Sequence, residues 1–206
     1  MAFKYNTYND SLPTEANTYL VKPVMKLLDK NKNKKILDVG CGNGYLVRTL
    51  VENGFDAYGL DASPSGIEMA KKYYPDRFVI HNIEDENLPD PFDKITFDTI
   101  ISTEVIEHLY SPEDFIAWIK SVLGKSKGQV IISTPYHGYL KNLIVGIFNL
   151  WDRHFTVLWE GGHIKFYSRK TLTQLLNKYG FEVTHFMGCK RPFLLWKAMI
   201  LKAELK

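Results

Sequence analysis

The strongest constraint on the fold is segment 36–46, where a short apolar run meets three glycines placed at every second position. The run contains Asp38, and the glycines are Gly40, Gly42 and Gly44. Glycine allows a tight turn and lets the backbone approach a ligand without a Cβ clash. The residues after the glycines read as a helix. A strand, a glycine turn and a helix N-terminus together predict a cradle for a charged ligand.

Strand-like and helix-like segments alternate along the rest of the chain. Helices are predicted at 14–30, 45–51, 64–73, 112–123 and 168–179, and strands at 36–39, 55–60, 78–81, 97–102, 128–133, 181–187 and 197–203. This alternation predicts an α/β, Rossmann-like fold, with a seven-stranded, mostly parallel sheet and helices on both faces. In such sheets the ligand lies beyond the carboxyl ends of the strands. Residues 1–206 are expected to form a single domain.

Composition narrows the class of protein. Apolar residues make up 45% and charged residues 24% of the 206, which is typical of a globular chain. The net charge of +3 is too small to indicate a nucleic-acid partner. Cys41 and Cys189 offer neither a disulfide framework nor a metal-ligand spacing, and the first residues contain no apolar signal core. We therefore expect a cytoplasmic protein.

The glycine spacing separates two kinds of cofactor site. A dinucleotide-binding G-x-G-x-x-G motif would need glycine at position 45, which is Tyr45. The observed G-x-G-x-G with Asp38 before it resembles the first motif of the class I S-adenosylmethionine (SAM) methyltransferases. Over roughly 35–187 the chain is similar to the group that contains the ubiquinone-biosynthesis O-methyltransferases. The resemblance implies the class I methyltransferase fold and SAM as the methyl donor.

The predicted cofactor residues lie at the carboxyl ends of four strands. The glycine loop would hold the methionine end, Asp61 would accept the ribose hydroxyls, and a serine would face the sulfonium. Ile83 and Glu84 would contact adenine. Asp61 could instead be a loop or capping acid, and Glu84 part of a solvated acidic run. The full predicted set is Asp38, Gly40, Cys41, Gly42, Gly44, Asp61, Ala62, Ile83, Glu84 and Ser102.

Two carboxylates and an imidazole follow the fourth predicted strand. On a helical turn, Glu104, Glu107 and His108 would share one face, because they occupy positions i, i+3 and i+4. With His163 as a fourth ligand they would form a site for Mg²⁺ or Mn²⁺. Such a metal would activate a hydroxyl of the acceptor. Glu107, His108 and His163 are the predicted catalytic residues.

Two other interpretations of this cluster remain open. His108 could act without metal, as a base or an acceptor-orienting group, or the cluster could be structural. The E-x-x-E-H pattern is also similar to that of the small-RNA 3′-terminal 2′-O-methyltransferases. The sequence therefore predicts SAM-dependent methyl transfer to a hydroxyl of a small or lipid-linked acceptor. An RNA 2′-O-methyltransferase and a non-catalytic SAM-binding protein are the alternatives.

A long connection follows the fifth predicted strand. Residues 136–162, about 27 in number, are rich in aromatic and aliphatic side chains. They are predicted to form a lid over an apolar or ring-bearing acceptor, the alternative being a helix packed on the core. The tail 191–206 mixes apolar and basic residues. With the lid it could contact a membrane surface, or it could be the last strand with its lysines toward water.

Overall fold

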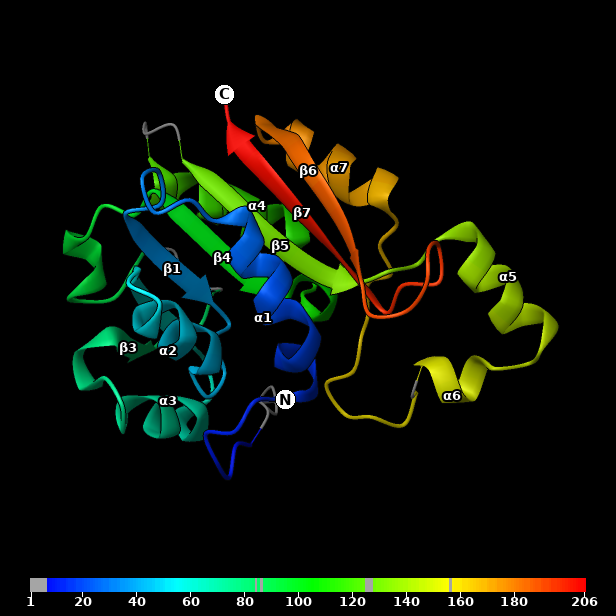
Figure 1. Cartoon of the computed structure of the whole chain (residues 1–206), viewed down its shortest axis with the longest axis horizontal. Helices are drawn as coiled ribbons and strands as arrows, with labels where there is room; N and C mark the ends of the chain where they lie inside the picture. The colour runs from blue at the N-terminus through cyan, green and yellow to red at the C-terminus, as the bar shows by residue number, and fades with distance from the viewer. Residues whose placement is uncertain (1–6, 84, 86, 125–127, 156) are drawn as a thin grey trace.

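The computed structural model describes residues 7–83, 85, 87–124, 128–155 and 157–206. Within them a seven-stranded sheet has the order β3-β2-β1-β4-β5-β7-β6 (Figure 1). The strands are β1 (Lys35–Val39), β2 (Asp56–Asp61), β3 (Phe78–Ile80), β4 (Thr99–Thr103), β5 (Gln129–Pro135), β6 (Phe181–Cys189) and β7 (Ala198–Leu205). Neighbours among β1 to β5 pair in parallel, whereas β7 is antiparallel to both β5 and β6. The predicted fold class is confirmed, including the seven strands.

Helices cover both faces of the sheet. They are α1 (Glu15–Leu27), α2 (Tyr45–Glu52), α3 (Pro64–Lys71), α4 (Pro112–Leu123), α5 (Tyr139–Ile147), α6 (Trp151–Phe155) and α7 (Arg169–Lys178). The helices α1, α2 and α3 bury apolar side chains in one core cluster, and α4 and α7 in a second one on the opposite face. Neighbouring strand residues alternate between the clusters, as Ile36 and Leu37 show. The alternation is the period-two pattern of a strand buried on both faces.

Local sequence explains where most helices begin. The Ser63 hydroxyl accepts a hydrogen bond from the Gly66 N–H at 3.2 Å, with Pro64 at the first helical position. Ser111 and Ser168 cap α4 and α7 in the same manner. These side chains satisfy amide groups that have no partner inside the helix. Helix α1 ends at Leu27, earlier than predicted, and contains Pro23.

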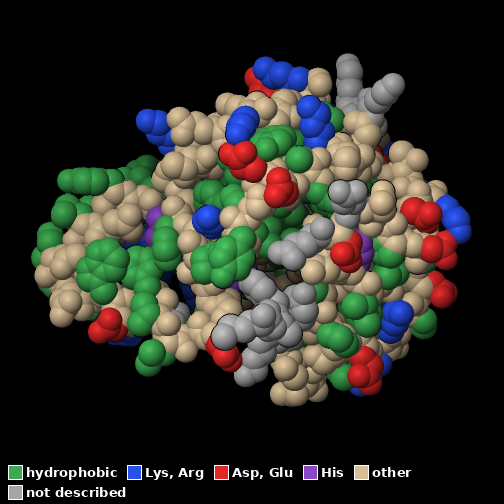
Figure 2. Space-filling view, turned by 180° about the vertical axis from the view of Figure 1, so that it is seen from behind, with side chains coloured by type: hydrophobic (Ala, Val, Ile, Leu, Met, Phe, Trp, Pro, Cys, Tyr) green, Lys and Arg blue, Asp and Glu red, His purple; other side chains and the backbone are tan. Residues whose placement is uncertain are grey.

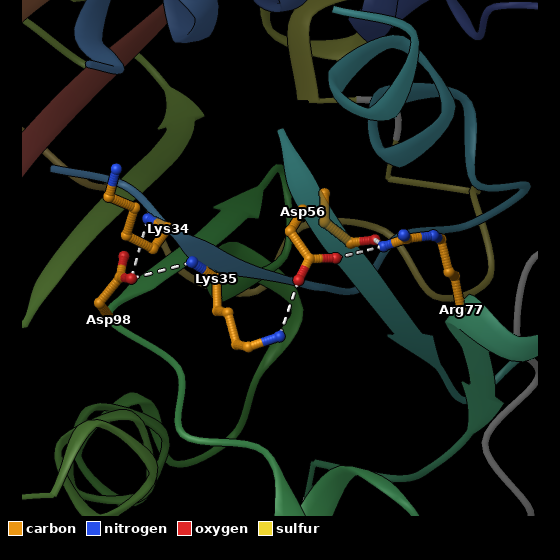
Figure 3. Close-up of polar contacts among 6 residues, drawn as sticks. Lys34, Lys35, Asp56, Arg77 and Asp98 are labelled. Carbon is orange, nitrogen blue, oxygen red and sulfur yellow. Dashed lines mark hydrogen bonds and ion pairs between the residues drawn. The ribbon is translucent and has the colours of Figure 1, made fainter. Parts of the chain in front are cut away.

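The amino ends of the strands are tied together by ionic contacts (Figure 3). The Asp98 carboxylate accepts hydrogen bonds from the backbone N–H groups of Lys34 and Lys35, at 2.9 and 2.8 Å. Asp56 is bound by the Lys35 ammonium at 2.7 Å and by the Arg77 guanidinium at 2.6 Å. This network stabilises the sheet at the edge opposite the carboxyl ends of the strands.

The segment after β5 carries α5 and α6, which extend away from the sheet (Figure 1). Most of its large apolar side chains are exposed, including Tyr139, Phe148 and Leu158. No helix in the described part of the chain combines the length and the apolar character needed to cross a membrane.

Candidate active site

A cavity of about 590 Å³ lies beyond the carboxyl ends of β1, β4 and β5. Five segments line it: the glycine loop, the start of α1, the end of β4, the segment 135–163, and the loop between β6 and β7. Residues from the N-terminal part of the chain, including Tyr8, also contribute to its wall. The site therefore combines segments that are far apart in the sequence, at the edge where the sequence predicts a ligand.

The glycine loop has the backbone that its sequence predicts. Gly40, Gly42 and Gly44 have φ angles of 77°, 56° and 75°, in the left-handed region that favours glycine. A Cβ at Gly42 would lie 2.5 Å from the Tyr8 hydroxyl, and one at Gly40 would overlap Val105. Gly40 and Gly42 line the cavity, whereas Gly44 is the N-cap of α2. The glycines thus let the loop pack closely against Tyr8 and Val105 at the wall of the cavity.

Two aspartates lie beside the glycine loop. Asp38 is buried and lines the cavity, and its Oδ1 has no hydrogen-bond partner among the described residues. Burial, and then the charge of Asp61, raise the pKa of Asp38 to about 8. Asp61 accepts hydrogen bonds from the N–H groups of Gly42 and Ser63, each at 2.7 Å, yet burial raises its pKa too. Each oxygen of Asp61 keeps a further lone pair for a ligand.

Other predicted cofactor residues lie outside this cavity. Ile83 packs partly against the core and lines a separate hollow of about 640 Å³ beside α4. Ser102 is fully buried inside β4, opposite Ile132 of β5. Asp61 and Ala62 do not line the cavity. Glu84 lies outside the described residues.

The residue of β4 that reaches the cavity is Thr103, which the sequence reasoning missed. The predicted strand ended at position 102, whereas β4 continues to Thr103. Successive side chains of a strand point to opposite faces, so a shift of one residue changes which of them meets a ligand.

The predicted helical turn from Glu104 to His108 is wrong. Only Ile106–His108 form a helix, of the 3₁₀ type, and Glu104 precedes it with a φ of 56°. The Glu104 N–H donates to the carbonyl and hydroxyl oxygens of Ser133, and the Ser133 hydroxyl donates to Glu104 Oε1 at 2.8 Å. Glu104 therefore lines the cavity from a strand end, separately from the face that Glu107 and His108 present.

Glu107, His108 and His163 do come together. One ligand atom from each lies within 4.8 Å of the others, and His163 Nε2 is 4.0 Å from Glu107 Oε1. The contact is built by backbone hydrogen bonds, because the N–H groups of Ile164 and Lys165 donate to the Glu107 carbonyl at 2.9 and 3.0 Å. Segment 163–165 is thereby held against the 3₁₀ turn that follows β4.

Burial controls the charges of this cluster. Glu107 is fully buried, and no donor among the described residues hydrogen-bonds its carboxylate. Desolvation, and then the neighbouring Glu104, raise the pKa of Glu107. Burial lowers the pKa of His108, and lowers that of His163 to about 4. Both imidazoles are therefore neutral near pH 7.

The tautomer of His108 follows from its neighbour. His108 Nδ1 lies 2.8 Å from the Gly161 carbonyl oxygen, which can only accept, so Nδ1 carries the proton. The other nitrogen, Nε2, then has a free lone pair. It is available to accept a proton or to bind a metal.

The structure adds polar residues that the sequence reasoning did not assign to the site. His137 and His154 line the cavity, and burial lowers the pKa of each to about 4. The added cationic residues are Lys141, Arg153, Arg191 and Lys197. They lie within the predicted insert and tail, but nothing in their sequence positions indicates that the four side chains meet at one cavity.

The sequence and the fold are both similar to those of known methyltransferases. A profile of the methyltransferase domain family matches residues 14–186. Magnesium protoporphyrin IX methyltransferase from Synechocystis, solved with bound SAH, superposes with a TM-score of 0.67, at 19% identity, over 91% of this chain and 82% of that one. The fold is thus that of the class I methyltransferases.

Two relatives of known name are both ubiquinone biosynthesis O-methyltransferases. The mitochondrial ubiquinone biosynthesis O-methyltransferase of Schizosaccharomyces pombe is 29% identical over 170 residues, which are 77% of this chain and 59% of that protein. The ubiquinone biosynthesis O-methyltransferase of Rickettsia canadensis is 28% identical over 174 residues, 82% of this chain and 72% of that protein. The chain belongs to the methyltransferase domain family, in the class I SAM-dependent group that the sequence resembles.

Proposed function

We propose that this chain transfers the methyl group of SAM to a hydroxyl oxygen of a small or lipid-linked acceptor. The observation that carries the proposal is a single cavity, one wall of which suits the cofactor and the other the acceptor hydroxyl. The glycine loop and Asp38 form one wall, and Glu104, His108 and His163 contribute to the other. The name O-methyltransferase, which the curated relatives carry, supports oxygen as the nucleophile.

The residues of the first wall fit the methionine end of SAM. Gly40 and Gly42 line the cavity, and Asp38 Oδ1, which has no partner among the described residues, can accept a hydrogen bond from an ammonium group. Asp61, next to the loop, is proposed to bind the ribose hydroxyls with its remaining lone pairs. The roles of Gly44, Cys41, Ala62, Ile83, Glu84 and Ser102 in cofactor binding remain predictions.

SAM supplies an electrophilic methyl group, and the residues of the second wall would prepare the acceptor hydroxyl. His108 Nε2, with its free lone pair, would take the hydroxyl proton as general base. The Gly161 carbonyl fixes the ring orientation that this role requires. Holding donor and acceptor in line supplies much of the remaining rate enhancement.

A divalent metal is a further proposal for the same wall. Glu107, His108 and His163 would hold it, since their ligand atoms converge and the Glu107 carboxylate lacks a donor among the described residues. A bound metal lowers the pKa of a coordinated hydroxyl. Two imidazoles and one carboxylate suit Mn²⁺, Fe²⁺ or Zn²⁺ better than Mg²⁺, which prefers oxygen ligands. Glu104 stands outside this group.

Contact with a membrane surface would suit a lipid-linked acceptor. Hydrophobic side chains gather over the part of the molecule that holds α5 and α6 (Figure 2). The exposed apolar residues of this region include Tyr139, Ile147, Phe148, Trp151 and Leu158. Contiguous apolar surface of this kind is typical of interaction sites.

The test of the proposed activity is formation of S-adenosylhomocysteine (SAH) from SAM with a panel of catechols and other hydroxyl acceptors. The His108→Gln variant should lose about 10²- to 10⁴-fold of the rate, the usual effect of removing a general base. The matched control is His185→Gln, because His185 is exposed on β6 and is not among the residues that line the cavity. No SAH with any acceptor, or an unchanged rate in His108→Gln, would contradict the proposal.

Metal binding can be measured without turnover, by titrating Mn²⁺ into the SAH-loaded protein. We expect one site, which Glu107→Ala and His108→Ala abolish. Glu104→Gln should retain it, because Glu104 lies outside the convergent group. Loss of binding in Glu104→Gln as well would show that Glu104 takes part in the metal site, and no binding by the wild type would remove the metal proposal.

A further inference from the structure

Four cationic side chains line the acceptor part of the cavity: Lys141 from α5, Arg153 from α6, and Arg191 and Lys197 from the loop between β6 and β7. Lys197 is paired with Glu15 at 2.6 Å. No acidic side chain among the described residues forms an ion pair with any of the other three. The insert and the β6–β7 loop, which lie side by side (Figure 1), thus bring to one cavity three cationic side chains without an ion pair to any described acid.

Lys141 is the most informative of these residues, since it is only 5% exposed. Its ammonium donates to the Tyr136 carbonyl oxygen at 2.7 Å, and an ammonium has two further N–H groups to donate. Burial, and then the charge of Arg191, lower the pKa of Lys141 to about 8. A buried cation that faces another cation is costly unless an anion accompanies it.

The acids of the cavity do not neutralise this charge. Glu104 is the acid that favours the charged form of Lys141, but its Oε1 accepts from Ser133, and burial raises its own pKa. Glu15 binds Lys190 and Lys197. Asp38 is buried beside the glycine loop, and its charge is likewise suppressed by burial.

The backbone around Arg191 provides an independent observation. Lys190, Arg191 and Leu194 have φ angles of 49°, 92° and 62°, unusual values for residues with side chains. Such conformations cost free energy and are concentrated at ligand-binding positions. The strain places a guanidinium at a cavity that already holds Lys141.

We propose that the acceptor carries an anionic group, a carboxylate or a phosphate, which Lys141 and Arg191 bind. The inference rests on the proposed function, and it names the substrate class. Binding the anion at the insert and the β6–β7 loop leaves the acceptor hydroxyl to face His108 and His163. Arg153 supplies a further donor from α6. Arginine and lysine bind both oxyanions well, arginine through paired N–H groups.

The test is calorimetric binding to the SAH-loaded protein, with 3,4-dihydroxybenzoate, 3,4-dihydroxyphenylphosphonate and catechol as probes. Either anionic probe should bind at least about tenfold more tightly than catechol, the scale of one charge-assisted hydrogen bond. The stronger of the two identifies the carboxylate or the phosphate as the natural group. Benzoate and inorganic phosphate extend the test to anions without a catechol.

Two variants locate the site. Lys141→Met and Arg191→Gln should each weaken binding of the anionic probe until its affinity approaches that of catechol. Lys22→Met, which removes an exposed lysine of α1 outside the cavity, should keep it. Arg191 is exposed, so its variant is informative even if Lys141→Met fails to fold.

The outcomes separate this inference from the proposed function. Absence of binding by every anionic probe, or a preference unchanged in both variants, overturns the anion site. A preference that the variants abolish, without SAH formation from SAM by the wild type, supports the anion site and contradicts the methyl transfer to those hydroxyls.

Discussion

At the scale of single residues, burial disfavours the charged form of several carboxyl and imidazole groups in and beside the cavity. Asp38 and Glu107 have raised pKa values, and His137, His154 and His163 have lowered ones, with desolvation as the leading cause. Groups of this kind are costly for the free protein and are characteristic of ligand sites. Their cost is expected to be visible in stability measurements.

Asp38→Asn should raise the stability of the ligand-free protein and weaken SAM binding. The pKa of Asp38 is about 8 when folded, against an ordinary value of 3.8, so the unfolded chain loses this proton first. Rising pH between these values therefore favours unfolding of the wild type. At pH 8 the variant should gain about 1–3 kcal/mol, the cost of a buried polar group without a partner.

The measurement is urea unfolding of both proteins at pH 4 and pH 8. The difference should be much smaller at pH 4, where the folded carboxyl group is protonated and the unfolded one, with a pKa of 3.8, is only partly ionised. A variant less stable than the wild type at pH 8 would show that Asp38 has a stabilising partner in the free protein.

At the scale of elements, α5 has two distinct surfaces. Lys141 and Val145 are buried, whereas Leu143, Ile147 and Phe148 expose between 42% and 67% of their surface. The buried side contributes Lys141 to the cavity, and the exposed side has no described partner for its apolar residues. This division leaves the outer surface of α5 available for contact with another apolar phase, as the membrane proposal requires.

The double variant Ile147→Ser, Phe148→Ser should lose most of the binding to vesicles that contain anionic lipid, because it removes apolar area from the exposed side. Co-sedimentation measures this directly. Ile80→Ser is the control, since Ile80 is similarly exposed but lies on β3. Absence of vesicle binding by the wild type would remove the membrane proposal.

At the scale of the whole molecule, stability and chemistry occupy opposite edges of the sheet. The contacts of Asp56 and Asp98 lie at the amino ends of the strands (Figure 3), and the cavity lies at the carboxyl ends. Burial opposes ionisation of Asp56, but hydrogen bonds from Lys35 and Arg77 hold its pKa below the usual range. Changes at one edge should therefore leave the other unaffected.

Asp56→Asn should lower the free energy of unfolding by about 1 kcal/mol, a value reduced by the partial exposure of the ion pairs. Because the folded pKa of Asp56 lies below its ordinary value of 3.8, its carboxylate stabilises the folded protein above that pH, and this stabilisation is lost as the pH falls through the folded pKa. The free energies of unfolding of the variant and the wild type should thus become equal at acidic pH. SAM affinity, measured by calorimetry, should be unchanged, and a large loss would contradict the separation of the two edges.

The sequence by itself determined the features that depend on local geometry. The glycine loop, the helix caps at Ser63 and Ser111, and the alternation of strand residues follow from φ preferences and from side-chain periodicity. The same local patterns predicted the family, the sheet and the edge at which the cavity lies. The convergence of His163 with Glu107 also agrees with the sequence-based expectation.

Only the tertiary structure decided which side chains meet in the cavity. Glu104 leaves the expected helical face because its backbone pairs with Ser133 of β5, a residue 29 positions away. Thr103 lines the cavity, whereas Ser102 is buried inside β4. Lys141, Arg153 and Arg191 share one cavity because the insert packs beside the β6–β7 loop. Such contacts depend on how distant segments pack, and no local preference encodes them.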